Sequence, residues 1–125
     1  MSGGVTSYRD LEVWQFAMGW IEGVYRSSAQ WPRDERFGLT SQVRRAAVSV
    51  ASNIAEGAAR RTTGEFLQFI GVARGSLAEA ETQIMIAARL GHLEPAAENR
   101  LLATAGRISR MLVSLAAALR ERKSR

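Results

Sequence analysis

Residues 37–61 read FGLTSQVRRAAVSVASNIAEGAARR, and this stretch decides the fold. Its apolar residues recur at intervals of three and four, which places them on one face of an α-helix. They are Leu39, Val43, Ala47, Val50 and Ile54. The opposite face is polar, so the pattern predicts one long amphipathic core helix. Gly57 costs a helix interior up to about 1 kcal/mol relative to alanine, and it therefore indicates a close contact or a bend.

Three further segments show helical periodicity, and none shows the period-two alternation of a half-buried strand. They are residues 10–28, 62–91 and 95–120. Because short connections join the four segments, the chain is expected to form an all-α, antiparallel up-down-up-down four-helix bundle. Its 125 residues suit a single domain over residues 1–125, with frayed ends at about 1–7 and 121–125.

Local signals mark the helix boundaries. Ser7 offers an alternative cap one turn before the first helix. Thr62 and Glu65 have the spacing of a capping box, which predicts the start of the third helix. Gly91 is typical of the position just past a helix end, and Pro95 of the first turn of the next helix.

The helix over residues 10–28 carries two neighbouring apolar stripes, which is more apolar surface than a bundle helix needs. The first stripe, expected in the core, contains Leu11, Trp14, Met18, Ile21 and Tyr25. The second stripe is predicted to form an oligomer interface. Its residues are Val13, Phe16, Ala17, Trp20 and Val24. The alternative is that the following connector folds over this surface.

That connector contains two aromatic residues, Trp31 and Phe37, between the helix breakers Pro32 and Gly38. Both aromatic side chains are expected to plug the end of the bundle. A solvent-facing tryptophan could instead stack on a nucleic-acid base.

The chain is basic, with a formal net charge of +5, and sixteen of its seventeen basic residues are arginine. The charge is uneven: residues 37–61 carry +3 and residues 92–125 carry +4, whereas residues 1–36 and 62–91 carry −1 each. This asymmetry indicates an anionic partner. GC-rich codon usage also favours arginine, and a charge run is also typical of a solvated face, so the charge by itself does not establish such a partner.

The arginines of these two segments are candidates for phosphate contacts, because a guanidinium group makes paired hydrogen bonds to phosphate. Those of the last helix are expected to lie opposite its core stripe and to face solvent. The predicted nucleic-acid-binding residues are Arg44, Arg45, Arg60, Arg61, Arg100, Arg107 and Arg110.

No pattern typical of a catalytic, cofactor or metal site is present. The chain has no cysteine, and its single histidine, His92, has no partners at metal-ligand spacing. It also lacks a glycine-rich phosphate loop and the GxSxG and HExxH motifs, so we expect no enzyme, cofactor or metal. The N-terminus has no signal-sequence pattern and the helix over 37–61 is too polar to cross a bilayer. A cytoplasmic protein with no membrane partner is expected.

Four stretches resemble the four-helix bundle family of 23S rRNA intervening-sequence proteins, also labelled S23 ribosomal protein. They are DLEVWQFAM (10–18), the stretch 37–61, EFLQFIGVARGSLAEAETQ (65–83) and ARLGHL (88–93). The resemblance covers about residues 8–120, with Ala51 where a proline is common before Ser52. It implies a homo-oligomer of five bundles. Accessory variability proteins of diversity-generating retroelements are related to this family, and for that branch the resemblance further implies a nucleic-acid-binding surface and a reverse transcriptase partner.

Two hypotheses for function follow. The first is a non-enzymatic, oligomeric accessory protein that contacts RNA or DNA phosphates through its arginines, largely without reading bases. The second is an interaction scaffold whose oligomer docks a protein partner and whose arginines keep it soluble. The sequence leaves both open.

Overall fold

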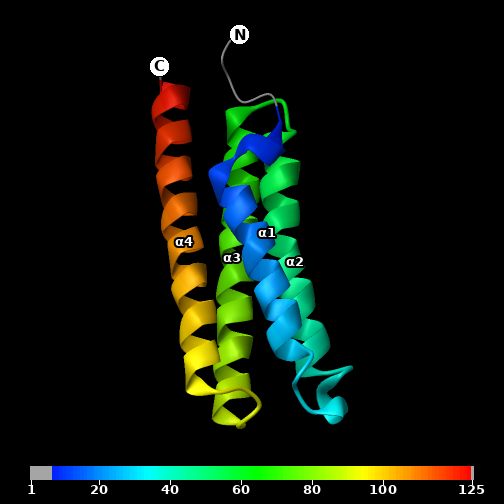
Figure 1. The fold of residues 1–125 in the computed structure, drawn as a ribbon. Coiled ribbons are helices and arrows are strands. Elements are labelled where there is room, and N and C mark those ends of the chain that lie inside the picture. Colours follow the sequence, from blue (N-terminus) through cyan, green and yellow to red (C-terminus); the bar gives the residue numbers. More distant parts are fainter. Residues whose placement is uncertain (1–6, 125) are drawn as a thin grey trace.

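The computed structural model describes residues 7–124, which form four α-helices and two short 3₁₀ turns (Figure 1). The helices are α1 (Glu12–Ser28), α2 (Leu39–Ala58), α3 (Thr63–Arg89) and α4 (Pro95–Ser124). The 3₁₀ turns are η1 (Tyr8–Asp10) and η2 (Arg33–Glu35). Successive helices run in opposite directions, as their colours show. The predicted all-α, up-down-up-down four-helix bundle is confirmed.

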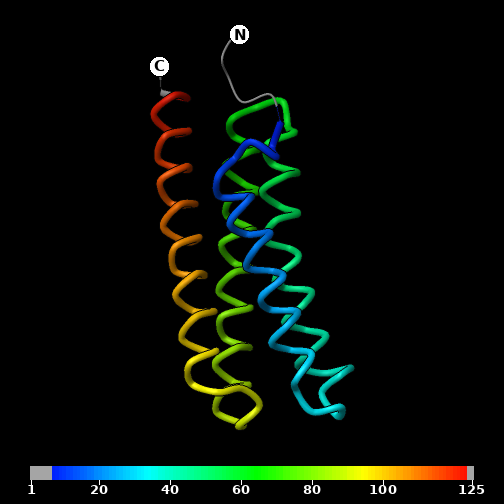
Figure 2. Tube along the Cα trace, in the orientation of Figure 1, coloured from blue at the N-terminus to red at the C-terminus, as the bar shows by residue number. Residues whose placement is uncertain are grey.

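The four helices form a ring. α1 packs against α2 and α4, and α3 packs against the same two helices, so α1 lies diagonally across from α3 (Figure 2). The contact between α2 and α3 is the most extensive. All four helices contribute to one core, whose largest fully buried side chains are Val24, Val43, Val50, Ile54, Ile70, Leu77, Ile84, Ile108 and Leu112.

Of the two predicted caps near helix starts, Thr62 is confirmed, whereas Ser7 caps a 3₁₀ turn and not the first α-helix. The hydroxyl of Ser7 accepts a hydrogen bond from the backbone N–H of Arg9 at 3.1 Å, although it caps η1 and α1 begins only at Glu12. The hydroxyl of Thr62 accepts from the N–H of Glu65 at 3.1 Å and donates to the carboxylate of the same residue at 3.0 Å. The side chain of Thr62 therefore satisfies an N–H that would otherwise lack a partner in the first turn of α3.

The ends that were expected to fray have regular structure where they are described, and their fraying stays a prediction. Ser7 is fixed by its capping bond, and α4 stays helical to Ser124. Arg122 and Lys123 in the last turn favour this, because cations interact well with the negative end of the helix dipole. Residues 1–6 and 125 lie outside the described part of the chain.

α4 is also long and apolar enough to cross a membrane by length and composition alone. Its most apolar window has a mean hydropathy of 1.3, and 28% of that window is buried in the bundle. Leu101, Ile108 and Leu112 of this helix are buried and pack in the core. One face of this helix therefore packs in the bundle core.

The two apolar stripes of α1 are exchanged relative to the prediction. Val13, Ala17, Trp20 and Val24 are the buried residues, whereas Met18 and Tyr25 of the expected core stripe are each 41% exposed. The rest of that stripe is half-buried. Both stripes have helical spacing, so periodicity identifies an apolar helix without saying which stripe turns inward.

The close contact expected at Gly57 is confirmed, and it lies between α2 and α3. A Cβ atom added to Gly57 would come within 2.7 Å of the Cβ of Phe69 and 3.0 Å of Cδ1 of Phe66. The first of these distances is shorter than real contacts allow, and the second is at that limit. Glycine is therefore the residue that lets α3 approach α2 here.

Of the two aromatic residues expected to close the bundle end, one does so. Trp31 is buried, at 6% exposure, but Phe37 is 85% exposed, so the prediction for Phe37 is wrong. The Phe37 ring lies outside the core and has the guanidinium of Arg36 at 4.8 Å from its centroid. A burial prediction for an aromatic residue in a short loop depends on the direction of one side chain, which composition does not set.

The turn between α3 and α4 ends α3 as predicted. Gly91 has a φ of 80°, in the left-handed region that favours glycine. Its N–H donates to the carbonyl of Ala88 at 3.0 Å, and the N–H of His92 donates to that of Ala87 at 2.9 Å. This pair of bonds is a Schellman motif, which satisfies the last carbonyl groups of the helix.

His92 links this turn to the start of α2. Its Nε2 donates to Oε2 of Glu35 at 3.0 Å, while Oε1 of the same carboxylate accepts from the N–H of Leu39 at 3.3 Å. Both bonds favour the ionised carboxylate, the bond from His92 more than the bond from Leu39. Together they hold the pKa of Glu35 below its ordinary value. The single histidine thus has a structural partner.

Glu35→Gln is expected to change how stability depends on pH. Because the pKa of Glu35 is lower in the folded protein, its carboxylate stabilises the fold above the ordinary pKa of 4.5, and this contribution is lost as the pH falls through the folded value. The wild type should be more stable than the variant at neutral pH, and the difference should shrink below pH 4.5. Urea unfolding of both proteins over a pH series measures it; a constant difference would contradict the argument.

Candidate nucleic-acid interface

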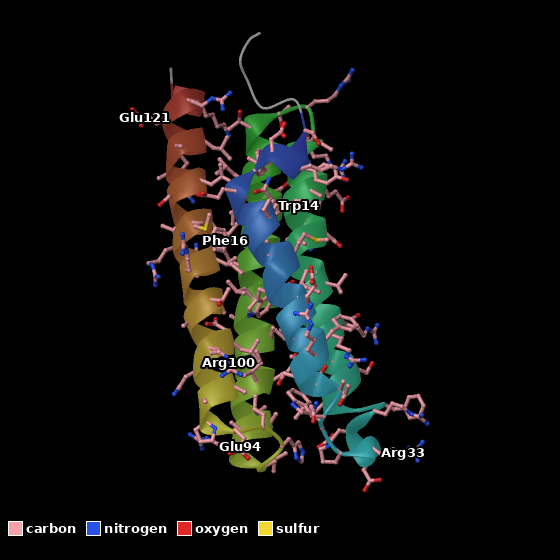
Figure 3. All side chains as sticks on the ribbon, viewed as in Figure 1. Trp14, Phe16, Arg33, Glu94, Arg100 and Glu121 are labelled. Carbon is pink, nitrogen blue, oxygen red and sulfur yellow. The ribbon has the colours of Figure 1, made fainter. Side chains whose placement is uncertain are left out.

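A groove follows the surface between α1 and α4. Three hollows of about 630, 510 and 570 Å³ succeed one another there. Gly23 and Leu101 line both the first and the second hollow, and Glu12 lines both the second and the third. They therefore form one surface, the α1–α4 groove. Figure 3 shows Phe16 on its α1 side and Arg100 on its α4 side.

The three predicted arginines of α4 line this groove. Arg100 borders the first two hollows, and Arg107 and Arg110 border the third. All three are exposed, as predicted, but Arg100 and Arg107 lie beside the core stripe and not opposite it. Arg100 and Arg107 each precede a core residue by one position, which sets them about 100° from the core direction and turns them toward α1.

The groove arginines differ in how they are held. The guanidinium of Arg107 lies over the ring of Phe16, 4.2 Å from its centroid, and this cation–π contact positions it. Arg100 and Arg110 are exposed and make no hydrogen bond or ion pair with any residue between 7 and 124. These two guanidinium groups are available to an anionic ligand.

The floor of the groove is apolar, and a buried hydrogen bond joins its two walls. The indole N–H of Trp20 donates to the carbonyl of Leu101 at 3.1 Å, which ties α1 to α4 below the surface. Phe16, Met111 and Leu115 are half-buried against the same core. Charged groups thus stand above an apolar base that also gives them a less polar surrounding than bulk water.

The two predicted arginines of α2 lie on another side of the bundle. Arg44 donates to the hydroxyl of Ser28 at 2.8 Å and to the carbonyl of Tyr25 at 3.2 Å, and stacks on the Tyr25 ring at 4.5 Å. It therefore holds α1 to α2. Arg45 is exposed. Neither residue lines the α1–α4 groove.

The arginines after α2 lie at the end of the bundle. Arg60 pairs with Glu56 at 2.8 Å and lies over the ring of Phe69 at 4.9 Å. Both Arg60 and Arg61 line a fourth hollow of about 660 Å³, and Arg122 of α4 lines it too. Arg61 and Arg122 make no hydrogen bond or ion pair within the described range.

The seven predicted residues thus do not form one surface. The three of α4 share the groove, two lie at its end, and two belong to the α1–α2 side. Arg122 was not among the predicted residues because positions 121–125 were expected to fray. Arg122 lies three positions after Leu119, which continues the helical spacing of α4. This spacing could have indicated that the helix extends to Arg122.

The predicted oligomer interface is wrong for most of its residues. Val13, Ala17, Trp20 and Val24 have exposures between 0% and 5% and lie inside the monomer. Phe16 is half-buried beneath Arg107 in the groove. The exposed apolar surface of α1 lies instead at Met18 and Tyr25, with Val48 of α2 also 40% exposed.

No group of three or more His, Asp or Glu side chains able to hold a metal ion occurs among the described residues. Asn53 and Glu56, the nearest approach to a polar constellation, have structural partners. The amide of Asn53 donates to the carbonyl and hydroxyl of Ser49, and that hydroxyl lies 2.8 Å from the hydroxyl of Ser76 on α3. These polar groups therefore join α2 to α3.

Comparison with known proteins agrees with the architecture. The profile of the family described as 23S rRNA-intervening sequence protein matches residues 9–114. The chain is similar to a crystal structure of a protein of unknown function from the S23 ribosomal protein family of Bacteroides thetaiotaomicron. The TM-score is 0.75 at 16% sequence identity, over 83% of this chain and 97% of the other, which is a likeness of fold. No curated protein matches the chain.

Proposed function

Because the chain belongs to the 23S rRNA-intervening sequence protein family, we propose that it is a non-enzymatic nucleic-acid-binding protein that holds an RNA or DNA backbone along the α1–α4 groove. Family membership gives the fold and the relatives but no mechanism. The proposal therefore depends on the groove itself. A cytoplasmic location without a membrane partner is part of it.

The observation that supports it best is the row of arginines on α4. Arg100 and Arg110 have no partner within residues 7–124, and Arg107 stands between them on the Phe16 ring. From Arg100 to Arg110 this row extends about 15 Å at 1.5 Å per residue. That length spans roughly four nucleotides at the 3.4 Å per phosphate of one strand in a duplex.

The groove is suited to backbone contacts more than to base reading. Guanidinium groups bind phosphate oxygens in any sequence. No Asn or Gln side chain lines the third hollow, which holds Arg107 and Arg110, whereas Gln15 lines the second hollow and Gln30 the first. Glu12 on the α1 rim repels phosphate and would keep the backbone on the α4 side. Binding should therefore be salt-dependent and largely independent of sequence.

Replacing Arg100 and Arg110 together with glutamine is expected to weaken binding without unfolding the protein, since neither side chain has an internal partner in the described structure. Two lost phosphate contacts should reduce the slope of log affinity against log salt by about 1.4 for a single strand. Fluorescence anisotropy with a labelled RNA at several salt concentrations measures both quantities.

The matched control is Arg33→Gln with Arg74→Gln, which removes the same charge from exposed positions outside the groove. Figure 3 shows Arg33 on the loop at the far side of the bundle. The control should keep the wild-type slope. Equal losses in both double variants would mean that overall charge, and no particular groove, attracts the nucleic acid.

Self-association is part of the proposal. The resemblance implies five copies, and the exposed apolar side chains of Met18, Tyr25 and Val48 offer a surface that a second copy could cover. For a gene within a diversity-generating retroelement, a reverse transcriptase would be the further partner. Native mass spectrometry tests the copy number, and a monomer at every concentration would remove this part.

The same apolar surface favours a second candidate function, an interaction scaffold without nucleic acid. Met18 and Tyr25 are each 41% exposed on a helix that already has a complete buried face. A protein partner recovered equally well before and after nuclease treatment would favour the scaffold. Loss of the partner on nuclease treatment would favour the nucleic-acid-binding function.

A further inference from the structure

The hollow at the end of the bundle differs from the other three in its charge. It measures about 660 Å³ and lies where the residues before α1, the turn between α2 and α3, and the last turns of α4 meet. Its lining contains no carboxylate, whereas Glu94 lines the first groove hollow and Glu12 the other two. Among the described residues, this end cavity is therefore the hollow most suited to an anion.

Basic groups reach the end cavity from two distant parts of the chain. Arg60 and Arg61 come from the α2–α3 turn, and Arg122 comes from α4. The ammonium group of Lys123 lies close by, since a Cβ atom added to Gly64 would be 3.2 Å from it. Of the three arginines, Arg60 alone is neutralised by a carboxylate in the described structure. Like charges gathered in this way repel one another, and a bound anion relieves that repulsion.

The remaining wall of the end cavity is apolar and aromatic. Tyr8, Phe66, Leu115 and Leu119 line it. The Tyr8 ring is fixed edge-to-face against Trp14, with 5.3 Å between the ring centroids. A ligand that fits both walls has a charged phosphate at one side and a flat, weakly polar ring at the other. A nucleotide has this chemistry.

The end cavity is continuous with the α1–α4 groove. Leu11 and Leu115 line both the end cavity and the groove hollow that contains Arg107 and Arg110. A strand lying on those arginines would therefore reach the end cavity without leaving the surface of the protein.

We propose that the end cavity binds a nucleoside phosphomonoester, with Arg61 and Arg122 on the phosphate and the Tyr8–Phe66 wall beside the base. Its source is either a free nucleotide or the terminal phosphate of a strand held in the groove. The strand source rests on the proposed function; the free nucleotide does not. A terminal phosphate carries a second negative charge that an internal phosphodiester lacks, so the cavity distinguishes strand ends from strand interiors.

The test compares single-stranded RNAs of one sequence that carry a 5′-phosphate, a 3′-phosphate or hydroxyl groups at both ends. Binding is measured by anisotropy, and a nucleoside monophosphate and inorganic phosphate are added separately as competitors. One phosphorylated end should bind about tenfold more tightly than the hydroxyl form, because hydrogen bonds to a charged group are strong. The mononucleotide should compete better than inorganic phosphate.

Arg61→Gln with Arg122→Gln should abolish the preference for the phosphorylated end and leave affinity for the hydroxyl RNA within about threefold. Arg100→Gln with Arg110→Gln should instead weaken the binding of phosphorylated and hydroxyl RNA alike, so that the ratio of the two affinities stays the same. Neither pair makes internal bonds in the described structure, so both variants should fold, which circular dichroism checks.

Equal affinity for all three RNAs, with no competition by the mononucleotide, would overturn the proposal that the end cavity binds a phosphomonoester. The proposed function of the groove would still stand. Mononucleotide binding that depends on Arg61 and Arg122, without binding of any RNA, would support the cavity and overturn the groove. An end preference that survives the Arg61 and Arg122 changes would also overturn the cavity assignment.

Discussion

Trp20→Ala is expected to destabilise the protein by about 3 to 5 kcal/mol, the usual cost of removing a large buried aromatic side chain. Trp20 is 3% exposed and fills the space between α1 and the first half of α4. Its indole N–H is also hydrogen-bonded to the carbonyl of Leu101, which the variant leaves without that donor. Urea unfolding followed by circular dichroism measures the loss.

Trp14→Ala is the matched control, because it removes the same side chain from the half-buried stripe of the same helix. Its loss should be clearly smaller, since alanine there leaves a partly solvated space and no closed cavity. A stable, folded Trp20→Ala protein that had merely changed its number of subunits would contradict the structure. It would instead favour the placement of Trp20 at an oligomer interface.

Gly57→Ala is the second change with a large expected effect, although alanine is normally the better helix former by up to about 1 kcal/mol. The new methyl group would lie 2.7 Å from the Cβ of Phe69, an atom that moves only with the backbone of α3. Overpacking of this kind costs about 1 to 3 kcal/mol. We expect net destabilisation, measured as a lower midpoint of urea unfolding.

Gly71→Ala is expected to have the opposite effect on the free energy of unfolding. Gly71 is exposed within α3, and no atom lies within 4 Å of a Cβ added there. The substitution should stabilise the protein by about 0.5 to 1 kcal/mol, since only helix propensity changes. If both glycine substitutions stabilised the protein, the close approach of α2 and α3 at Gly57 would be wrong.

The helices and their ends could be predicted because they depend on residues near one another in the sequence. The intervals of Val43, Val50 and Ile54 define a helix without knowledge of its neighbours. Thr62 and Gly91 act on backbone groups within five positions of themselves. Such local signals do not depend on how the rest of the chain packs.

The orientation of α1 could not be predicted in the same way. Both of its stripes are apolar and both have helical spacing, so the choice depends on what lies opposite. The deciding contact is the hydrogen bond from Trp20 to Leu101, between residues 81 positions apart. No local pattern contains that partner.

Only part of the candidate site could be predicted, because it too depends on contacts between distant parts of the chain. Charge by segment identified α4 as basic, and Arg100, Arg107 and Arg110 do share a surface. Composition could not separate them from Arg44, whose guanidinium is occupied by Ser28 and Tyr25. Whether an arginine is free depends on the geometry of three helices, which its own sequence neighbourhood does not define.

The two walls of the groove, α1 and α4, are far apart in the sequence, and this has a consequence for synthesis on the ribosome. α1 and α2, like α2 and α3, can meet as soon as both have emerged, but α1 has no partner for its Trp20 side until α4 is made. Before then that apolar face is bare and the row of arginines does not exist. The nascent chain therefore acquires its proposed binding surface only with α4, and exposed apolar surface of this kind is prone to aggregation up to that moment.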